Sequence, residues 1–358
     1  VRAFGEARLA AVELATSAGS LQLETDWLAC AFGLVPRVEL AAITSEQRAG
    51  VPAGEAFPGL RGLVDLSFEA LDAASLAERV DVAFCCLPAG EVSARAVATL
   101  HAGGVRVVDL SADFRLRSMA DYERAYGAHA APELFGKAVY GIPELYREQM
   151  PEARLVAAAG CYPTCAGLAL LPFLRAGVIE TSGIVIDAKS GVSGAGRKLA
   201  DDYLYGELDG NPHAYKVGRV HRHVPEMEQE ASIAAGEPIQ LAFVPHLMPT
   251  TRGMLATIVT RPRRTITTQD AIAVLSEAWG EEPFVRVLPE GEVPQIAAVR
   301  GTNFCDVTAV ADPGSGTLLL LSALDNLTKG AGGQMVQCLN AMCGFDEREG
   351  LWGAPLLP

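Results

Sequence analysis

The chain has 358 residues, half of them apolar, and a formal net charge of −14 at pH 7. This length is sufficient for two domains with sizeable cores. The acidic balance argues against a nucleic-acid partner, and the apolar runs are too short to span a bilayer. Eight cysteines without a CxxC pair are typical of reduced thiols, not of a disulfide framework or zinc site. No secretory signal is recognisable, so we expect a soluble, cytoplasmic protein.

The first half of the chain alternates short apolar strands with helices. Strand patterns fall at 38–44, 80–87 and 105–110, and helical patterns at 71–79 and 93–102. Continuous apolar strands separated by helices are typical of a parallel sheet covered on both faces. We therefore predict an α/β fold whose first domain, residues 1–157, is a Rossmann-like doubly wound sheet.

Residues 159–164 (AGCYPT) lie between a buried strand pattern at 155–158 and a buried helix pattern at 165–174, with Pro163 near the first turn. Cys161 is thus expected at a strand-to-helix turn. Backbone N–H groups and the helix dipole at such a turn lower the pKa of a thiol and favour its thiolate. The hypothesis is a nucleophilic cysteine enzyme; the alternative is an inert buried cysteine.

Three other segments carry chemical groups. Residues 189–197 (KSGVSGAGR) expose backbone N–H groups that can cradle an anion, unless they form an ordinary flexible loop. His221 and His223 flank Arg222, and histidine is suited to proton transfer near pH 7; metal binding or a structural role are the alternatives. Arg252 is a candidate partner for a carboxylate or phosphate, or a member of a surface ion pair.

The second half contains more strands. Strand patterns fall at 183–188, 239–244, 255–260, 284–288, 305–311 and 317–324, several of them without long helices between. This succession predicts a second α+β domain with a mixed, largely antiparallel sheet over residues 158–325. The last strong helix pattern covers 333–342.

Taken together, these segments resemble the N-acetyl-gamma-glutamyl-phosphate reductases of the semialdehyde dehydrogenase family, from about residue 38 to the C-terminus. The motifs that carry the resemblance are 109–115 (DLSADFR), 140–145 (YGIPEL), 159–164 (AGCYPT), 189–197 (KSGVSGAGR), 221–223 (HRH), 249–253 (PTTRG), 301–303 (GTN) and 326–330 (NLTKG). Each motif alone is weak, whereas their number, order and spacing together are specific.

The resemblance implies NADPH-dependent reduction of N-acetyl-L-glutamyl 5-phosphate to N-acetyl-L-glutamate 5-semialdehyde and phosphate, in arginine biosynthesis. Cys161 would attack the acyl phosphate and form a thioester, which hydride from NADPH would convert to a hemithioacetal that releases the aldehyde. Either His221 or His223 would act as acid and base, with a slight preference for His221. The candidates for binding the substrate's phosphate and carboxylate are Arg115, Ser190, Arg197 and Arg252.

The resemblance also implies an NADP site without a metal ion. Ser45 and Arg48 would lie near the adenosine 2′-phosphate. The other expected cofactor contacts are Leu87, Pro88, Gly90, Ser193, Gly194, Asn303, Asn326, Lys329, Gly333 and Gln334. Residues 158–325 would form the catalytic and oligomerisation domain of a dimer or tetramer, and the segment 326–358 would return its helix to the first domain.

The N-terminus departs from the family pattern, which places a GxxGxxG-type loop after the first strand. Within residues 11–25, Leu21, Leu23 and Glu24 stand where small residues are expected, and their side chains would obstruct or repel a pyrophosphate. Ala89 replaces a histidine that the family often carries. The interpretations left open are a mistranslated start ahead of an intact enzyme, phosphates held differently, or a catalytically silent member. An aspartate-semialdehyde dehydrogenase-like enzyme is a further alternative.

Overall fold

The computed structural model describes residues 7–12, 38–195 and 200–355. The atypical stretch with Leu21, Leu23 and Glu24 lies outside these residues, and so does Arg197. The chain divides into two compact units. The first comprises Val1–Ala159, Ala195–Leu199 and Ala331–Trp352, and the second comprises Gly160–Gly194, Ala200–Gly330 and Gly353–Pro358.

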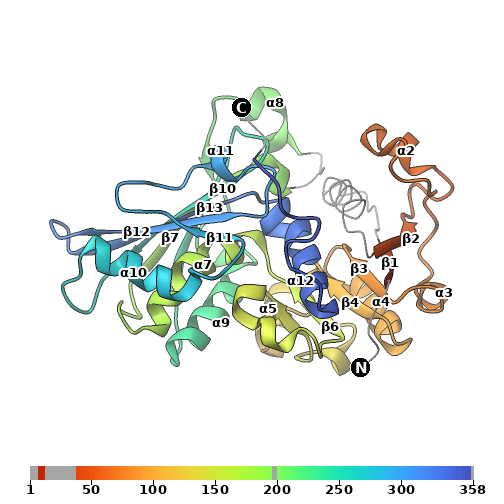
Figure 1. The fold of residues 1–358 in the computed structure, drawn as a ribbon, viewed down its shortest axis with the longest axis horizontal. Helices are drawn as coiled ribbons and strands as arrows, with labels where there is room; N and C mark the ends of the chain where they lie inside the picture. Colours follow the sequence, from red (N-terminus) through yellow and green to blue (C-terminus); the bar gives the residue numbers. More distant parts are fainter. Residues whose placement is uncertain (1–6, 13–37, 196–199, 356–358) are drawn as a thin grey trace. The chain divides into compact units, whose positions relative to one another are not determined.

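A six-stranded, all-parallel sheet forms the centre of the first unit, with the strand order β2-β1-β3-β4-β6-β5 (Figure 1). Its strands are β1 (Ala7–Val12), β2 (Val38–Thr44), β3 (Val82–Cys85), β4 (Arg106–Asp109), β5 (Val139–Gly141) and β6 (Leu155–Ala158). The Rossmann-like class is confirmed. The order reverses direction between β1 and β3, and doubly wound sheets bind ligands at the carboxyl ends of the strands at such a point.

Helices connect and cover these strands. They are α2 (Ala53–Ala56), α3 (Ala73–Ala77), α4 (Glu91–Ala102), α5 (Met119–Tyr126), α6 (Pro143–Tyr146) and α12 (Gly333–Cys343). In α4, Ala94, Val97 and Leu100 are fully buried at the spacing of one helix face, and they share a core with the sheet. The C-terminal helix α12 packs against β4, β5 and β6, so this late segment completes the core of the first unit.

The second unit is built on a seven-stranded mixed sheet with the order β11-β12-β13-β10-β7-β9-β8. Its strands are β7 (Ile184–Gly191), β8 (His213–Ala214), β9 (Leu241–Met248), β10 (Met254–Thr260), β11 (Val285–Val287), β12 (Cys305–Asp312) and β13 (Thr317–Leu324). Only the β7–β9 and β11–β12 pairs of this sheet are parallel. The predicted mixed, largely antiparallel sheet is confirmed.

The helices of the second unit are α7 (Cys161–Arg175), α8 (Tyr205–Leu208), α9 (Val224–Ala235), α10 (Thr268–Trp279) and α11 (Ile296–Val299). Figure 1 shows α7, α9 and α10 on one side of the sheet, which they contact. Because residues alternate between the two faces of a strand, β7 and β10 are buried at every second position, beneath these helices, and half-exposed at the positions between.

Several of the later strands follow one another without a long helix, as predicted, but two 12-residue helices for which no pattern was recognised, α9 and α10, lie between others. In α9 the buried side chains include Glu226 and Glu230, so hydrophobic periodicity does not mark its buried face. The start of α10 carries a capping box in which Thr267 and Asp270 bond reciprocally to each other's backbone. That local signal was present in the sequence.

The helix α7 is buried along most of its length, as expected, and contains an interior proline. Because Pro172 has no N–H, the carbonyl of Leu168 loses its usual helical donor. The indole Nε1 of Trp279 donates to that carbonyl instead, at 2.8 Å, and thereby ties α10 to α7. In the part of the chain that the structure describes, no helix is both long and apolar enough to cross a membrane.

Candidate active site

Cys161 is the first residue of α7, a 15-residue helix that begins four residues earlier than predicted. Gly160 is the N-cap, and its N–H donates to the buried carboxylate of Glu226 at 2.8 Å. The Cys161 side chain is half-buried. The thiol therefore occupies the position where the N–H groups and the positive end of a long helix favour a thiolate.

The space beside Cys161 depends on Gly330. A Cβ atom added to Gly330 would lie 2.9 Å from the Cβ of Cys161 and 3.2 Å from Leu324 Cδ1. Gly330 belongs to the π-helical turn η7 (Thr328–Gly332), and π-helical turns occur often at functional sites. A residue 169 positions later in the sequence thus determines how much room the nucleophile has.

His221 and His223 are brought together, with ring centroids 5.0 Å apart, and both rings contact Tyr162, the residue after Cys161. His221 Nδ1 accepts a hydrogen bond from the backbone N–H of His223 at 3.1 Å. A neutral His221 ring therefore carries its proton on Nε2. Tyr215 and Phe243 also pack edge-on against the His221 ring.

Electrostatics keep the His221 ring neutral. Burial, followed by the nearby charges of His223 and Lys216, lowers the pKa of His221 to about 3, while Glu226 acts in the opposite direction. At pH 7 this imidazole is therefore a neutral group that offers one N–H donor.

Two tyrosines join this cluster. The hydroxyls of Tyr162 and Tyr215 are hydrogen-bonded at 3.0 Å, and burial raises the pKa of both phenols well above the usual range. The charge of Cys161 adds to both increases, so the sulfur lies within electrostatic reach of the pair. A hydrogen bond to Ser190 acts in the opposite direction on Tyr162, which connects this predicted substrate residue to the cluster.

The other cysteines have different surroundings. Seven cysteines lie in the described part of the chain, and all are free thiols. Burial raises the pKa of Cys165, one turn further along α7, to about 12, and also raises the pKa of Cys85 and Cys343. Cys165 Sγ lies 3.2 Å from Ser322 Oγ inside the core. Cys161 is therefore set apart by its position at the helix terminus.

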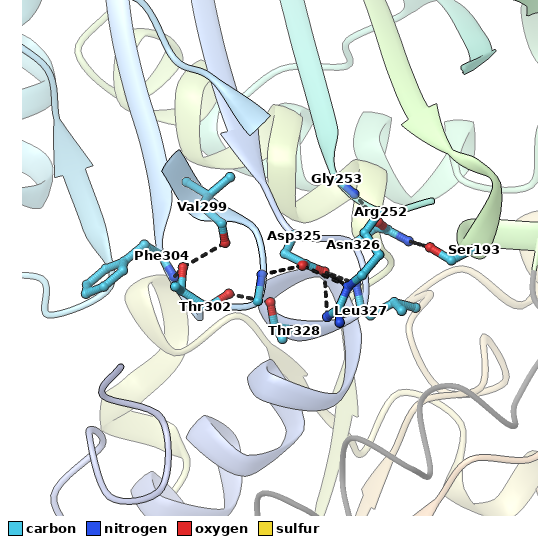
Figure 2. Close-up of polar contacts among 11 residues, drawn as sticks. Ser193, Arg252, Gly253, Val299, Thr302, Phe304, Asp325, Asn326, Leu327 and Thr328 are labelled. Atoms are coloured by element: carbon cyan, nitrogen blue, oxygen red, sulfur yellow. Dashed lines mark hydrogen bonds and ion pairs between the residues drawn. The ribbon is translucent and has the colours of Figure 1, made fainter. Parts of the chain in front are cut away.

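Arg252 pairs with Asp325, whose side chain is fully buried, at 3.0 Å between Nε and Oδ2. The same carboxylate accepts hydrogen bonds from the N–H groups of Gly301 and Leu327 at 2.6 and 2.8 Å (Figure 2). The surface ion pair considered for Arg252 is thus a partly buried one, and Asp325 joins three separate loops.

Asn326 joins two further segments. Its Oδ1 accepts from the N–H of Gly253 at 2.7 Å and its Nδ2 donates to Ser193 Oγ at 3.0 Å (Figure 2). A Cβ on Gly191 would lie 2.8–2.9 Å from the backbone of residues 250–252, so only glycine permits this close approach. Of the predicted residues, the structure therefore brings Ser193, Arg252 and Asn326 together. Gly194 lies beside them, because its added Cβ would lie 3.0 Å from Ser190 and 3.7 Å from Asn326.

In the first unit, Ser45 directly follows β2 and is fully buried. Its hydroxyl has no hydrogen-bond partner among the described residues. Arg48 donates to the carbonyl of Ala56 at 3.2 Å and its guanidinium stacks on the ring of Phe57 at 4.8 Å. Glu46, the acidic side chain between them, accepts from the N–H of Leu71 at 2.9 Å.

Leu87, Pro88 and Gly90 form the turn after β3, with Leu87 buried. Arg115 is buried and donates to the carbonyl of Leu110. The remaining predicted residues are buried in the turns around η7 and α12 or before β12: Asn303, Lys329, Gly333 and Gln334.

Reasoning from the sequence gave no individual role to Glu226, Tyr162, Tyr215, Gly330 and Asp325, although Tyr162 and Gly330 lie within recognised motifs. A signal existed for Glu226, since an acidic residue in the first turn of a helix follows the two histidines closely. No local pattern marks Tyr215 or Asp325, because their contacts cross long stretches of sequence. Within residues 7–12, 38–195 and 200–355, no group of three or more His, Cys, Asp or Glu residues could hold a metal ion.

Two protein families match this chain. Residues 34–153 match the family described as "Semialdehyde dehydrogenase, NAD binding domain" and residues 161–326 match "Semialdehyde dehydrogenase, dimerisation domain". The fold agrees with aspartate semialdehyde dehydrogenase II from Vibrio cholerae, with a TM-score of 0.68 at 16% identity over 94% of this chain and 98% of that one. The aspartate semialdehyde dehydrogenase with NADP from Candida albicans gives 0.65 at 13% identity over 94% and 98%. The two family matches, together with the fold, thus define a semialdehyde dehydrogenase-type protein with a nicotinamide nucleotide-binding domain.

Curated relatives specify the family further. The chain is 47% identical to the N-acetyl-gamma-glutamyl-phosphate reductase of Citrifermentans bemidjiense and 49% identical to that of Geobacter sulfurreducens. Each alignment spans 323 residues, 90% of this chain and 93% of the relative. The chain belongs to the N-acetyl-gamma-glutamyl-phosphate reductase family.

Proposed function

We propose that this protein reduces N-acetyl-L-glutamyl 5-phosphate to N-acetyl-L-glutamate 5-semialdehyde with NADPH, in arginine biosynthesis, and that Cys161 is its nucleophile. The observation that carries this proposal is the half-buried thiol at the start of α7, next to Tyr162, whose ring packs against the neutral His221 imidazole. The names of the relatives supply the substrate. The cysteine content supports a cytoplasmic location, since no disulfide joins the described cysteines.

Cys161 attacks the carbonyl carbon of the acyl phosphate as a thiolate, and the C–O bond to phosphate breaks. The backbone N–H groups at the start of α7 are oriented to stabilise the oxyanion formed in this step. The product is a thioester on Cys161. A nicotinamide nucleotide, when bound, supplies the hydride that reduces this thioester to a hemithioacetal. Collapse of the hemithioacetal in its alkoxide form breaks the C–S bond, releases the aldehyde and restores the thiolate.

His221 is the proposed hydrogen-bond donor to the reacting oxygen. With Nδ1 engaged by the His223 N–H, the neutral ring presents Nε2–H, which stabilises the oxyanion by a hydrogen bond and keeps its proton. His223 is the proposed partner that fixes this tautomer. Glu226 supports both sides of the site, because it accepts from Gly160 at the start of α7 and reduces the pKa lowering at His221.

The residues after β2 fit an adenosine 2′-phosphate. This turn contains Ser45, whose buried hydroxyl has no hydrogen-bond partner among the described residues, and the guanidinium of Arg48. An arginine at this position accommodates a 2′-phosphate. An acidic side chain in this region would favour NAD, but Glu46 is engaged with Leu71. Ser45 and Arg48 thus support NADP as the cofactor. The other proposed cofactor residues are Leu87, Pro88, Gly90, Ser193, Gly194, Asn303, Asn326, Lys329, Gly333 and Gln334.

Arg252, Ser190, Arg115 and Arg197 are the proposed binding residues for the substrate's phosphate and carboxylate, because guanidinium groups match the geometry of both anions. Of these, Arg252 has the best-defined position, since buried Asp325 holds its guanidinium.

We further propose that the protein is a dimer or tetramer formed through the half-exposed face of the seven-stranded sheet. Val185, Val259, Leu319 and Val310 form an apolar row on that face across β7, β10, β13 and β12. The family description of residues 161–326 as a dimerisation domain supports this assignment. A Leu319→Glu variant that sediments as a monomer would support it, and a wild-type protein that is monomeric at micromolar concentration would refute it.

The proposed activity is tested by phosphate-dependent oxidation of N-acetyl-L-glutamate 5-semialdehyde with NADP, with aspartate semialdehyde and NAD as alternative reactants. The proposal requires turnover of the N-acetylated substrate at a rate at least 100-fold above that of aspartate semialdehyde. Preference for aspartate semialdehyde would assign the protein to the related activity. Absence of NADPH binding up to millimolar concentration would identify a catalytically silent family member.

A further inference from the structure

The turn after β3 is fixed by a side chain of the 109–115 motif to which the proposed mechanism gives no role. Gly90, the N-cap of α4, donates its N–H to both carboxylate oxygens of Asp113, at 3.0 and 3.1 Å. Gly90 has φ = 136° and ψ = −160°, a backbone region essentially restricted to glycine. Asp113 therefore holds the end of the β3–α4 turn in a conformation that an ordinary residue would not adopt.

Asp113 is fully buried, which is costly for a carboxylate unless hydrogen bonds and favourable charges compensate. The Tyr122 hydroxyl donates to its Oδ1 at 2.6 Å. The carboxylate also lies at the N-cap of a 12-residue helix, where the helix dipole favours negative charge. Two charged groups lie close by, Asp109 at the end of β4 and Arg115. Burial is the main cause of the raised pKa of Asp109, the charge of Asp113 raises this pKa further, and that of Arg115 lowers it.

The backbone of Asp113 is equally constrained. Its N–H donates to Ser111 Oγ at 3.1 Å, and its carbonyl accepts from His129 Nε2 at 2.8 Å. Because a carbonyl can only accept, the His129 proton is on Nε2, and its Nδ1 accepts from the N–H of Ala131 at 3.0 Å. The His129 ring packs at 4.7 Å from that of Tyr122. Hydrogen bonds from neighbouring segments therefore fix both the side chain and the backbone of Asp113.

We propose that Asp113 is a positioning residue for the nicotinamide nucleotide: by holding Gly90 it preorganises the β3–α4 turn at the point where the sheet order reverses, and it occupies the N-terminus of α4 with the chain's own negative charge. This inference rests on the proposed nucleotide-dependent function. Preorganisation avoids the cost of ordering the turn on binding, so its loss should weaken nucleotide binding while leaving the chemistry at Cys161 unchanged.

The experiment compares Asp113→Asn with Tyr122→Phe in the full-length protein. Both variants remove a hydrogen-bonding group from the same buried network, but only Asp113→Asn places an amide N–H against the Gly90 N–H. The dissociation constant of NADPH is measured by fluorescence or calorimetry, and KM for NADPH and kcat by steady-state kinetics. We expect Asp113→Asn to raise both the dissociation constant and KM at least tenfold with kcat within threefold of wild type. Tyr122→Phe should lower the melting temperature but leave the dissociation constant within twofold.

Four outcomes would overturn the inference. Equal NADPH affinity in wild type and Asp113→Asn would show that the Gly90 contact does not position the nucleotide. Equal weakening by both variants would show a general stability effect. No NADPH binding by the wild type would refute the proposed function together with this inference. If Asp113→Asn does not fold, the Gly90 amide of the nucleotide-free wild type decides: exchange at least 100-fold slower than in an unstructured chain supports the inference, and unprotected exchange refutes it.

Discussion

A single added methyl group at Gly330 provides a quantitative test of the site. In Gly330→Ala the new Cβ would lie 2.9 Å from Cys161 Cβ, which is about 0.6–1.1 Å short of the optimal 3.5–4.0 Å separation between carbon atoms. Leu324 Cδ1, at 3.2 Å, and the carbonyl oxygen of Asp325, at 3.4 Å, limit the directions in which the methyl group can move. The clash is therefore expected to displace Cys161.

A displacement of about 1 Å at a reacting atom costs on the order of 100-fold in rate. We accordingly expect Gly330→Ala to reduce kcat/KM about 10- to 100-fold, with a stability loss of about 1–3 kcal/mol from overpacking. The assay is phosphate-dependent semialdehyde oxidation, followed by NADPH absorbance, together with a thermal melt. The rate at which iodoacetamide alkylates Cys161 reports the position and exposure of the sulfur independently of substrate binding.

Gly167→Ala is the matched control. It places the same methyl group on α7, where the nearest atom is Leu171 Cδ1 at an ordinary distance of 3.4 Å. Replacing glycine inside a helix stabilises it by up to about 1 kcal/mol, so we expect full activity and unchanged or higher stability. Wild-type kcat/KM in a folded Gly330→Ala variant would refute the reasoning, because the position of the nucleophile would then not depend on Gly330.

Other changes test the remaining parts of the site. Cys161→Ser should abolish aldehyde formation in a folded protein, whereas Cys165→Ser should keep activity within about threefold; activity in the first variant would exclude the thioester mechanism. His221→Asn should reduce kcat about 10²- to 10³-fold, the usual contribution of one hydrogen-bond donor to an oxyanion. The pKa of His221 is about 3 in the folded protein, and the pKa of a histidine in an unfolded chain is about 6.5. Between these pH values the unfolded state binds more protons than the folded state. Wild type should therefore lose up to about 1 kcal/mol of stability per pH unit on acidification from pH 6.5. His221→Asn should show a shallower decline in melts between pH 7 and 5, and equal slopes would contradict the assigned pKa. Asp325→Asn should lower the free energy of unfolding by about 3 kcal/mol, measured with a denaturant, because it leaves the Arg252 charge without its buried partner. A decrease below about 1 kcal/mol would show that the ion pair does not anchor the loops.

Much of the fold was predictable because it depends on local periodicity. The strand at Val38–Thr44 was predicted with the observed bounds, and that at Leu155–Ala158 likewise. The helix α9 was missed because two of its buried side chains are glutamates, which an apolar pattern cannot reveal. The backbone of β1 pairs with β2 and β3 in parallel, although the sequence around it lacks the expected glycine loop.

The candidate site was predictable in part. A cysteine before a buried helix and two histidines in one short motif can be recognised locally, and both lie in one cluster in the second unit. Their roles remain proposals. The partners that give these residues their properties were not predictable, since Glu226 reaches the N–H of Gly160 across 66 positions and Arg252 reaches Asp325 across 73.

The sequence alone determined that a thiol would stand at the start of a helix, because strand and helix periodicities and a proline in the first turn are properties of neighbouring residues. Only the tertiary structure decided that the thiol has Gly330 beside it, that the next residue packs on a neutral imidazole, and that a glutamate binds the helix N-cap. The physical reason is that burial, and the electrostatic shifts that follow from it, depend on which distant segments pack together.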